Sequence, residues 1–370
     1  MWPPSTASGE LRTINGIRNI VQQLNINPAL SKNEAKGFVG QSLLLDIPNF
    51  NFILDIPTEY MHSFCLGVMK RLLELTFKIG EVRSRITKRK LLSPTLYNST
   101  MHDVKVPKEF SRRARTLDLS VMKAQELRNV LLFFFPIVLT CIPNEPKEKQ
   151  LWLLLTFMIR ACIVPTIEFQ NVNLAHVEQS CTKFYTLFYQ LFGDTNCSYS
   201  VHLIGTHLLQ MRHKGPFTFT SAFIFESFYG EMRQSFTPGT TSTLKQILEK
   251  ILLKRILGHH NCETSIYFSH KDTALECNSY IYTFTNNKHN LYIIQEIDPN
   301  NNDLFTCCPL GYFPAKFNET PNLNWTTVGV FRQGGMSSDC VVVNRASIAG
   351  KVIKVCGLLI TCPNNILREK

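Results

Sequence analysis

The sequence has no Cys-x-x-Cys pair, although it contains 12 cysteines. Such pairs supply the ligands of many structural zinc sites, so a zinc ribbon is disfavoured. Cys307 and Cys308 are adjacent rather than spaced, and the other cysteines are scattered. The first residues, MWPPS, lack the basic and apolar regions of a secretory signal peptide. We therefore expect reduced thiols in an intracellular protein rather than a disulfide framework.

A long apolar run is also missing. The nearest approach, 130–142, contains Pro136 and is shorter than the roughly 18 apolar residues that a membrane span needs. We expect a buried helix there and no membrane partner. The motifs G-x-S-x-G and H-E-x-x-H and the P-loop do not occur either, so a serine hydrolase, a zinc peptidase and a P-loop nucleotidase have no support.

The composition is that of a folded protein with an excess of positive charge. Of the 370 residues, 44% are hydrophobic and 18% are charged, which indicates a large core and two or three domains. The formal net charge is +11. This charge suits a polyanionic partner, although charge alone does not establish one.

The segment 49–75 organises the chain. Apolar residues recur along one helical face from about Glu59 onward: Met61, Phe64, Cys65, Val68, Leu72 and Leu75. Glu59 lies at the expected start of this helix, where the dipole favours a carboxylate, and His62 lies in its first turn. One interpretation is a metal or phosphate site. The other is a capping Glu beside a core His.

Hydrophobic periodicity predicts an α+β chain. Short apolar runs at 42–47 and 50–56 indicate one or two strands. Helices are expected at 17–24, 59–79, 120–142, 150–163, 173–193, 199–212, 221–236 and 243–257. Short β-branched and aromatic runs follow at 266–268, 280–284, 292–297, 328–331, 340–343 and 352–360. The expected domains are an N-terminal segment 1–58, a helical domain 59–258, and a β-rich domain 259–370 that forms a small barrel or sandwich.

Two basic runs flank the same helical unit. Lysines and arginines that neutralise phosphates give salt-sensitive binding to DNA that does not depend on sequence. The alternatives are a nuclear localisation signal and a solvated loop. The residues expected to bind nucleic acid are Arg83, Arg85, Lys88, Arg89 and Lys90 in the first run and Arg112, Arg113 and Arg115 in the second.

Five blocks, in order, carry a family resemblance. They are GQSLLLDIPNFNFILDIPTEYMHSFCLGVMKRL, VPKEFSRRARTL, MKAQELRNVLLFF, VHLIGTHL and SAFIFESFYGEMRQSF, and they extend from about residue 40 to 257. In this order the chain resembles the C-terminal portion of animal DDE/D cut-and-paste transposases related to the CACTA group, the CMC superfamily. The last 110 or so residues look like the variable tail of these proteins.

The resemblance implies a remnant of an RNase H-like catalytic core with a large, mostly helical insertion. In such enzymes three carboxylates hold two Mg²⁺ or Mn²⁺ ions that drive phosphoryl transfer on DNA. Glu226 falls at the position of the third acid. Gly230 and Arg233 lie on its helix face, where Gly230 would let a phosphate backbone approach and Arg233 would contact it. The alternative is an ordinary surface glutamate. A buried stripe is expected opposite: Ala222, Phe225, Tyr229, Met232 and Phe236.

A histidine pair precedes the final acid in related transposases, where it can join a zinc site. Here the pair is His202 and His207, spaced by five residues rather than four. The cysteines that normally complete such a site are missing. A pair retained without metal is the alternative to Zn²⁺ binding.

The chain departs from the family pattern at three points. Asn51 stands where the resemblance places the second acid, and a neutral amide holds Mg²⁺ less well than a carboxylate does. Glu59, just before His62, stands where the family has an aspartate and is longer by a methylene. The first acid and its strand have no counterpart before residue 40.

These features together predict a truncated or domesticated transposase. We expect a nuclear DNA-binding protein that does not complete metal-dependent strand transfer as this chain alone. The alternative is a non-enzymatic scaffold whose β module binds another protein or a second copy. A third possibility is a decaying element with no selected role. A catalytic role for Glu226, Glu59 and His62 stays open at this point.

Overall fold

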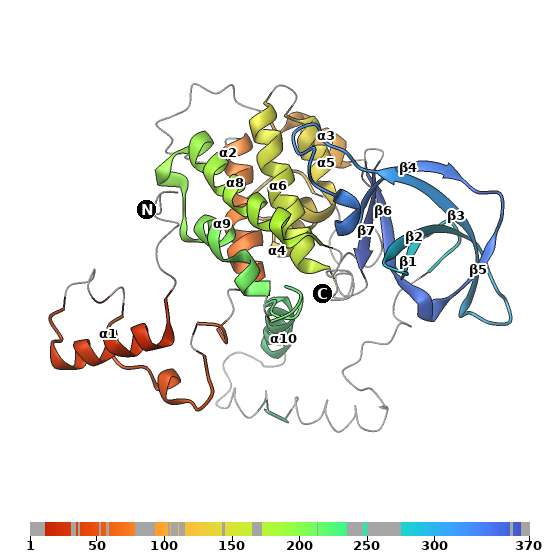
Figure 1. Ribbon diagram of the computed structural model, residues 1–370. Helices are drawn as coiled ribbons and strands as arrows, with labels where there is room; N and C mark the ends of the chain where they lie inside the picture. Colours follow the sequence, from red (N-terminus) through yellow and green to blue (C-terminus); the bar gives the residue numbers. More distant parts are fainter. Residues whose placement is uncertain are drawn as a thin grey trace.

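The computed structural model is a helical body joined to a β-barrel (Figure 1). It describes residues 12–30, 38–51, 53–56, 59–77, 93–102, 115–142, 145–164, 172–212, 214–234, 275–355 and 358–363, and the single residues 35, 104, 110, 246, 248 and 249. The mixed α+β class is therefore confirmed. The expected helix 243–257, the strand 266–268 and the boundary at 258 lie outside these ranges or are described only in part.

Most of the expected helices form. The α-helices are α1 Ile14–Ile26, α2 Lys70–Phe77, α3 Thr95–His102, α4 Ala124–Asn129, α5 Phe135–Thr140, α6 Pro146–Ile163, α8 Leu174–Phe192, α9 Tyr199–Arg212 and α10 Phe223–Gln234. Two π-helices, η3 Met61–Met69 and η4 Val130–Phe134, lead directly into α2 and α5. Short 3-10 helices are η2 Leu43–Asp46, η5 Asp194–Asn196, η7 Trp325–Val328 and η8 Arg345–Ser347. Helix α3 has no counterpart among the helices expected from the sequence.

Helix α6 lies at the centre of the helical body. All its residues from Leu151 to Ile163 are buried, which is typical of a helix that is apolar all round. It packs against α8, and α8 in turn packs against α9. The predicted stripe on η3 and α2 faces the same core, with Phe64, Cys65, Val68 and Leu72 almost fully buried.

The C-terminal strands close into a barrel. They are β1 Tyr280–Thr285, β2 Lys288–Ile297, β3 Leu304–Pro314, β4 Val330–Met336, β5 Val341–Asn344, β6 Ile348–Val355 and β7 Leu358–Pro363. All pairings are antiparallel in the order β2-β1-β6-β7-β4-β3-β5, and β2 also pairs with β3, which completes a six-stranded ring. Strand β5 extends the ring beside β3. Closure removes most exposed strand edges.

The barrel and the helical body share one hydrophobic core. Trp325 of η7 stacks on Phe135 of α5 and meets Phe157 of α6 edge-on, with ring centroids 6.0 and 5.5 Å apart. Buried residues of β6 and β7 belong to the same cluster. Figure 1 shows β6 and β7 on the side of the barrel nearest the helices.

Arg160 of α6 ties the two parts together. Its guanidinium donates to the carbonyl oxygens of Val328 at 2.8 Å, Leu132 at 3.0 Å and Thr361 at 3.0 Å. The residue is 4% exposed. A buried cation of this kind is stable only while its donors are satisfied. The contact therefore links α6 to the end of η7 and to β7.

Three expectations are wrong. The strands predicted at 42–47 and 50–56 do not form in the described residues, because Leu43–Asp46 is a 3-10 helix and 53–56 is a turn. No strand outside Tyr280–Pro363 occurs in the described part of the chain, so the catalytic sheet expected before residue 58 is not formed there. The single strand expected at 352–360 is wrong, because this interval contains the end of β6 and the start of β7. Strand β3 was not expected from the sequence.

Candidate functional site

The structure brings Glu59, His62 and Glu226 together. The Glu59 Oε2 atom lies 2.8 Å from His62 Nδ1, and His62 Nε2 lies 3.9 Å from Glu226 Oε1. These residues come from the turn before η3, the first turn of η3, and α10. The histidine thus stands between two carboxylates that are far apart in the sequence. We call these three residues the Glu59–His62–Glu226 cluster.

Glu59 owes its position to helix capping. Its Oε1 accepts from the amides of Met61 and Ala222, both at 2.6 Å. Its Oε2 accepts from the His62 amide at 2.6 Å in addition to the ring nitrogen. One carboxylate therefore serves the first amides of η3 and the amide just before α10, where unpaired N–H groups attract negative charge.

His62 and Glu226 are open to solvent. Their side chains are 55% and 57% exposed, whereas that of Glu59 is 25% exposed. The sequence left two interpretations of Glu59, a ligand in a metal or phosphate site and a helix cap. Its contacts in the structure are those of a helix cap. The core position for His62 is wrong, because the ring lies at the surface.

The donors present do not fit a two-metal centre. A carboxylate offers about four lone-pair positions, and the hydrogen bonds to Glu59 occupy that number. Glu226 is then the one acid of the cluster with room for a cation. Within the described ranges, no group of three or more His, Cys, Asp or Glu residues is placed to hold a metal ion. Mg²⁺ and Mn²⁺ therefore find no complete ligand set here.

Asn51 is a turn residue in the structure. Its Oδ1 accepts from the amides of Ile53 at 3.0 Å and Leu54 at 3.1 Å. The Asn51 amide donates to Asp55 Oδ2 at 2.7 Å, and Asp55 also pairs with Lys214. Asparagine side chains form such local turns readily. The amide oxygen that the resemblance assigns to metal binding is thus engaged with the backbone.

His202 and His207 are neighbours on α9, with ring centroids 5.3 Å apart. His202 is buried beside the Tyr185 ring, and His207 Nδ1 lies 2.9 Å from Gln210 Oε1. Zinc sites in proteins use three or four ligands. The two histidines approach each other, but the described residues add no third ligand to them.

The buried histidine predicts a pH-dependent stability. Burial lowers the pKa of His202 below its usual 6.5, and the nearby His207 adds to the effect. The unfolded chain therefore binds a proton that the folded protein does not, so the free energy of unfolding falls as the pH drops below 6.5. Urea unfolding should give a lower free energy of unfolding at pH 5.5 than at pH 7.5, and His202→Gln should reduce this difference. An unchanged pH dependence in His202→Gln, or a larger reduction in His207→Gln than in His202→Gln, contradicts the assignment.

Helix α10 is anchored at its start and exposed along its length. Phe223 is buried, and the Arg128 guanidinium lies 4.9 Å from its ring centroid. The stripe predicted to be buried is wrong at its centre, because Phe225 and Tyr229 are 63% and 60% exposed. Arg233 is exposed as well. A Cβ added at Gly230 would meet no atom within 4 Å, which leaves room for a ligand backbone beside it.

Most of the basic residues expected to bind nucleic acid lie outside the described residues: Arg83, Arg85, Lys88, Arg89, Lys90, Arg112 and Arg113. Arg115 is described. Its Nε lies 2.8 Å from Oε1 of the buried Glu126. That guanidinium is thus engaged in an internal ion pair, which reduces what it offers to phosphate.

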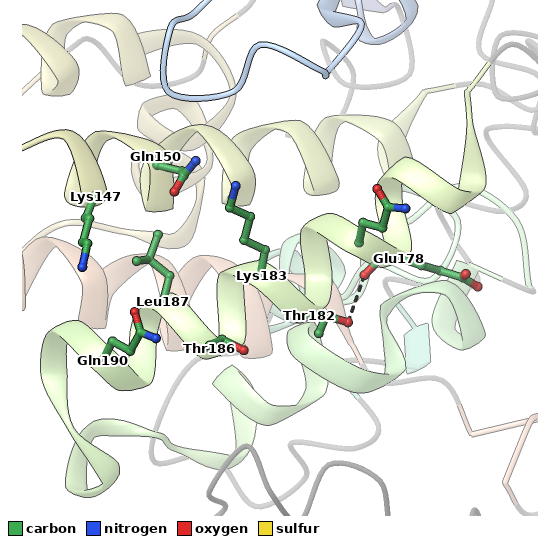
Figure 2. Close-up of a pocket in the computed structure, with 9 residues that line it drawn as sticks. Lys147, Gln150, Glu178, Thr182, Lys183, Thr186, Leu187 and Gln190 are labelled. Carbon is green, nitrogen blue, oxygen red and sulfur yellow. Dashed lines mark hydrogen bonds between the residues drawn. The ribbon is translucent and has the colours of Figure 1, made fainter.

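A groove of about 610 Å³ lies between α6 and α8. Figure 2 shows Lys147 and Gln150 projecting from α6 and Lys183 and Glu178 from α8. None of its lining residues belongs to the Glu59–His62–Glu226 cluster. Sequence reasoning missed this groove and the Ala222 amide that Glu59 binds. No local pattern marks either one, because both arise from contacts between distant segments.

Comparisons with known proteins leave the family of this chain open. No protein-family model, no curated protein and no solved structure matches it. In the part of the chain that the structure describes, no helix combines the length and apolarity that crossing a bilayer requires. The function is therefore argued from the residues.

Proposed function

We propose that this chain is a transposase-derived DNA-binding protein whose catalytic centre is incomplete. The observation that carries the proposal is the meeting of His62 with Glu226. The segment around His62 and the segment around Glu226 are two of the five blocks that carry the transposase resemblance. Contact between them, across more than 160 residues, is what a common ancestral site requires. The RNase H-like ancestry of the core is part of the same proposal.

The chemistry of the cluster argues against strand transfer by this chain alone. The side-chain oxygens of Asn51 and Glu59 accept hydrogen bonds from backbone amides. Of the three residues that the resemblance places at acid positions, Glu226 alone keeps an accessible carboxylate. Two-metal phosphoryl transfer needs carboxylates on both ions. The proposal therefore assigns His62 and Glu226 to the contact surface around α10 rather than to catalysis.

The affinity for DNA rests on charge. The net charge of +11 and the exposed Arg233 beside the open Gly230 suit a phosphate backbone. The two basic runs, 81–90 and 105–115, supply the other cations. Phosphate contacts of this kind bind DNA without reading its sequence. A nuclear location, as such a partner requires, belongs to the proposal.

Fluorescence anisotropy with a duplex DNA tests the proposal. Binding through about six phosphates should weaken by roughly a thousandfold between 50 and 200 mM salt, because each contact releases counterions. Arg112→Gln with Arg113→Gln should weaken binding and lower the salt slope by about two contacts.

The matched control removes two positive charges elsewhere. Lys147→Gln with Lys183→Gln, in the groove between α6 and α8, should leave the salt slope unchanged. Affinity that does not fall with salt would exclude binding through phosphates. Equal losses in the two double variants would show that net charge alone, and not the basic run, governs the affinity.

A specific observation also favours the scaffold function. Strand β5 pairs only with β3 among the described strands, and Val342 on it is 69% exposed. An exposed edge can accept a strand from another protein or from a second copy. Of the aromatic residues on β1 and β2, Tyr282 is fully buried, and Tyr280, Phe284 and Tyr292 are half-buried.

A further inference from the structure

Two cysteines of the barrel face each other at close range. Cys308 of β3 and Cys340, just before β5, have their Sγ atoms 2.9 Å apart. The β3–β5 ladder pairs Cys307 with Val341, so the next step of the same register sets Cys308 opposite Cys340. Side chains that face each other across an antiparallel pair have Cβ atoms about 4.5–5.5 Å apart. That spacing is close to what a disulfide spans.

Backbone contacts between β3 and the segment that contains Cys340 keep the two cysteines opposite each other. The Ser337 amide donates to the Pro309 carbonyl oxygen at 3.0 Å, and Thr306 pairs with Val342 further along the ladder. The connection between β4 and β5 is thus attached to β3 on both sides of the two thiols. Joining the sulfurs at about 2.05 Å requires a movement of less than about 1 Å.

The two thiols differ in access. Cys308 is buried, and Cys340 is exposed. The hydrogen bond with Cys340 raises the pKa of Cys308, and desolvation adds to the effect, so Cys308 stays a protonated thiol at neutral pH. An oxidant therefore reaches Cys340 first. Cys307, next to Cys308, is fully buried in a separate hydrophobic cluster and does not compete.

We propose that Cys308 and Cys340 form a reversible disulfide that clasps the β4–β5 connection to β3. The oxidant is a small-molecule disulfide such as oxidised glutathione. The Cys340 thiolate attacks one sulfur of this disulfide, which forms a mixed disulfide and releases one thiolate. The Cys308 thiol then gives up its proton and attacks the Cys340 sulfur, which expels the second thiolate. The two cysteines lose two electrons and two protons, and the oxidant is reduced to two thiols.

The disulfide would be a covalent link within the β-barrel. In a reducing compartment the pair stays as two thiols, and it closes when the surrounding thiol–disulfide balance becomes oxidising. The link spans 32 positions of the chain and holds β5 in register beside β3. Register is strongly specified only where pairing or burial enforces it, and β5 has one partner strand.

Thiol counting on the full chain tests the clasp. The protein is incubated with oxidised glutathione, quenched with acid, denatured, alkylated and weighed intact. Because the chain has 12 cysteines, the reduced protein should carry 12 alkyl groups and the oxidised protein 12 − 2 = 10. Non-reducing digestion should yield the Cys308–Cys340 linked peptide, and dithiothreitol should restore the full count.

Two variants decide the assignment. Cys340→Ser should show 11 alkyl groups or a single glutathione adduct and never the loss of two thiols. Cys277→Ser, which removes another exposed cysteine, should still lose two thiols, from 11 to 9. Loss of two thiols in Cys340→Ser would overturn the proposal. So would a wild type that stops at a mixed disulfide on Cys340, or linkage of Cys340 to Cys277.

Discussion

Replacement of Arg160 by methionine should cost about 3–5 kcal/mol of unfolding free energy. Methionine fills a similar space but donates no hydrogen bond, so the carbonyl oxygens of Val328, Leu132 and Thr361 each lose a charged donor. Hydrogen bonds to charged groups are worth about 1.5–3 kcal/mol each, and the sum is reduced because the three act together. Urea unfolding, followed by fluorescence and by far-UV circular dichroism, measures the loss.

The same variant tests how the barrel depends on the helices. Arg160 joins α6 to the end of η7 and to β7, so its loss should separate the unfolding of the two parts. We expect the two spectroscopic probes to give different midpoints in Arg160→Met but a single midpoint in the wild type. Coincident midpoints would mean that the aromatic contacts of Trp325 suffice to couple the parts.

Arg332→Met is the matched control. Arg332 lies on β4, is exposed, and donates to one carbonyl oxygen, that of Lys316, at 3.1 Å. Loss of a single exposed contact should change the unfolding free energy by no more than about 0.5 kcal/mol. A similar cost for both arginines would show that charge, and not the buried carbonyl contacts of Arg160, is responsible.

Replacement of Glu59 by glutamine should cost about 2–3 kcal/mol, because Glu59 caps two elements at once. Glutamine keeps the shape but turns an NH₂ group toward amides that also donate. Either the contacts to Met61 and Ala222 or those to His62 must then break. Hydrogen exchange followed by mass spectrometry should show faster exchange at the start of both η3 and α10.

Glu226→Gln is the control for this second variant. Glu226 is exposed, and its carboxylate lies 3.9 Å from the His62 ring, so Glu226→Gln should change stability by less than about 0.5 kcal/mol. An effect on η3 alone in Glu59→Gln would contradict the contact with α10. Equal effects of the two variants would contradict the capping role.

Local patterns predicted those elements whose signal lies within one helical or strand segment. The apolar stripe from Met61 to Leu75 and the continuous apolarity of α6 both report directly which face is buried. The alternating runs after residue 279 gave the barrel strands, since the turns between them carry recognisable Asn and Gly residues. Strand β3 was missed because Pro309 and Gly311 interrupt it, and such residues usually mark strand ends.

Short apolar runs predicted strands wrongly where capping side chains compete with strand pairing for the backbone amides. The run 42–47 reads as a strand, but the Ser42 hydroxyl accepts from the Leu44 amide and starts a 3-10 turn. Asn49 adopts a positive φ of 58° and Asn51 closes the next turn. Serine and asparagine offer the backbone these local partners, and the described residues place no strand beside this segment to compete with them.

The sequence by itself determined the helical body, the β-rich end, the excess of positive charge, and the residue types of the Glu59–His62–Glu226 cluster. Only the tertiary structure decided what those residues do. Glu59 proved to be a shared cap, Arg160 a link between two modules, and Cys308 a partner for Cys340. The reason is physical: periodicity reports the burial of one face, whereas a contact between distant residues depends on how the whole chain closes on itself.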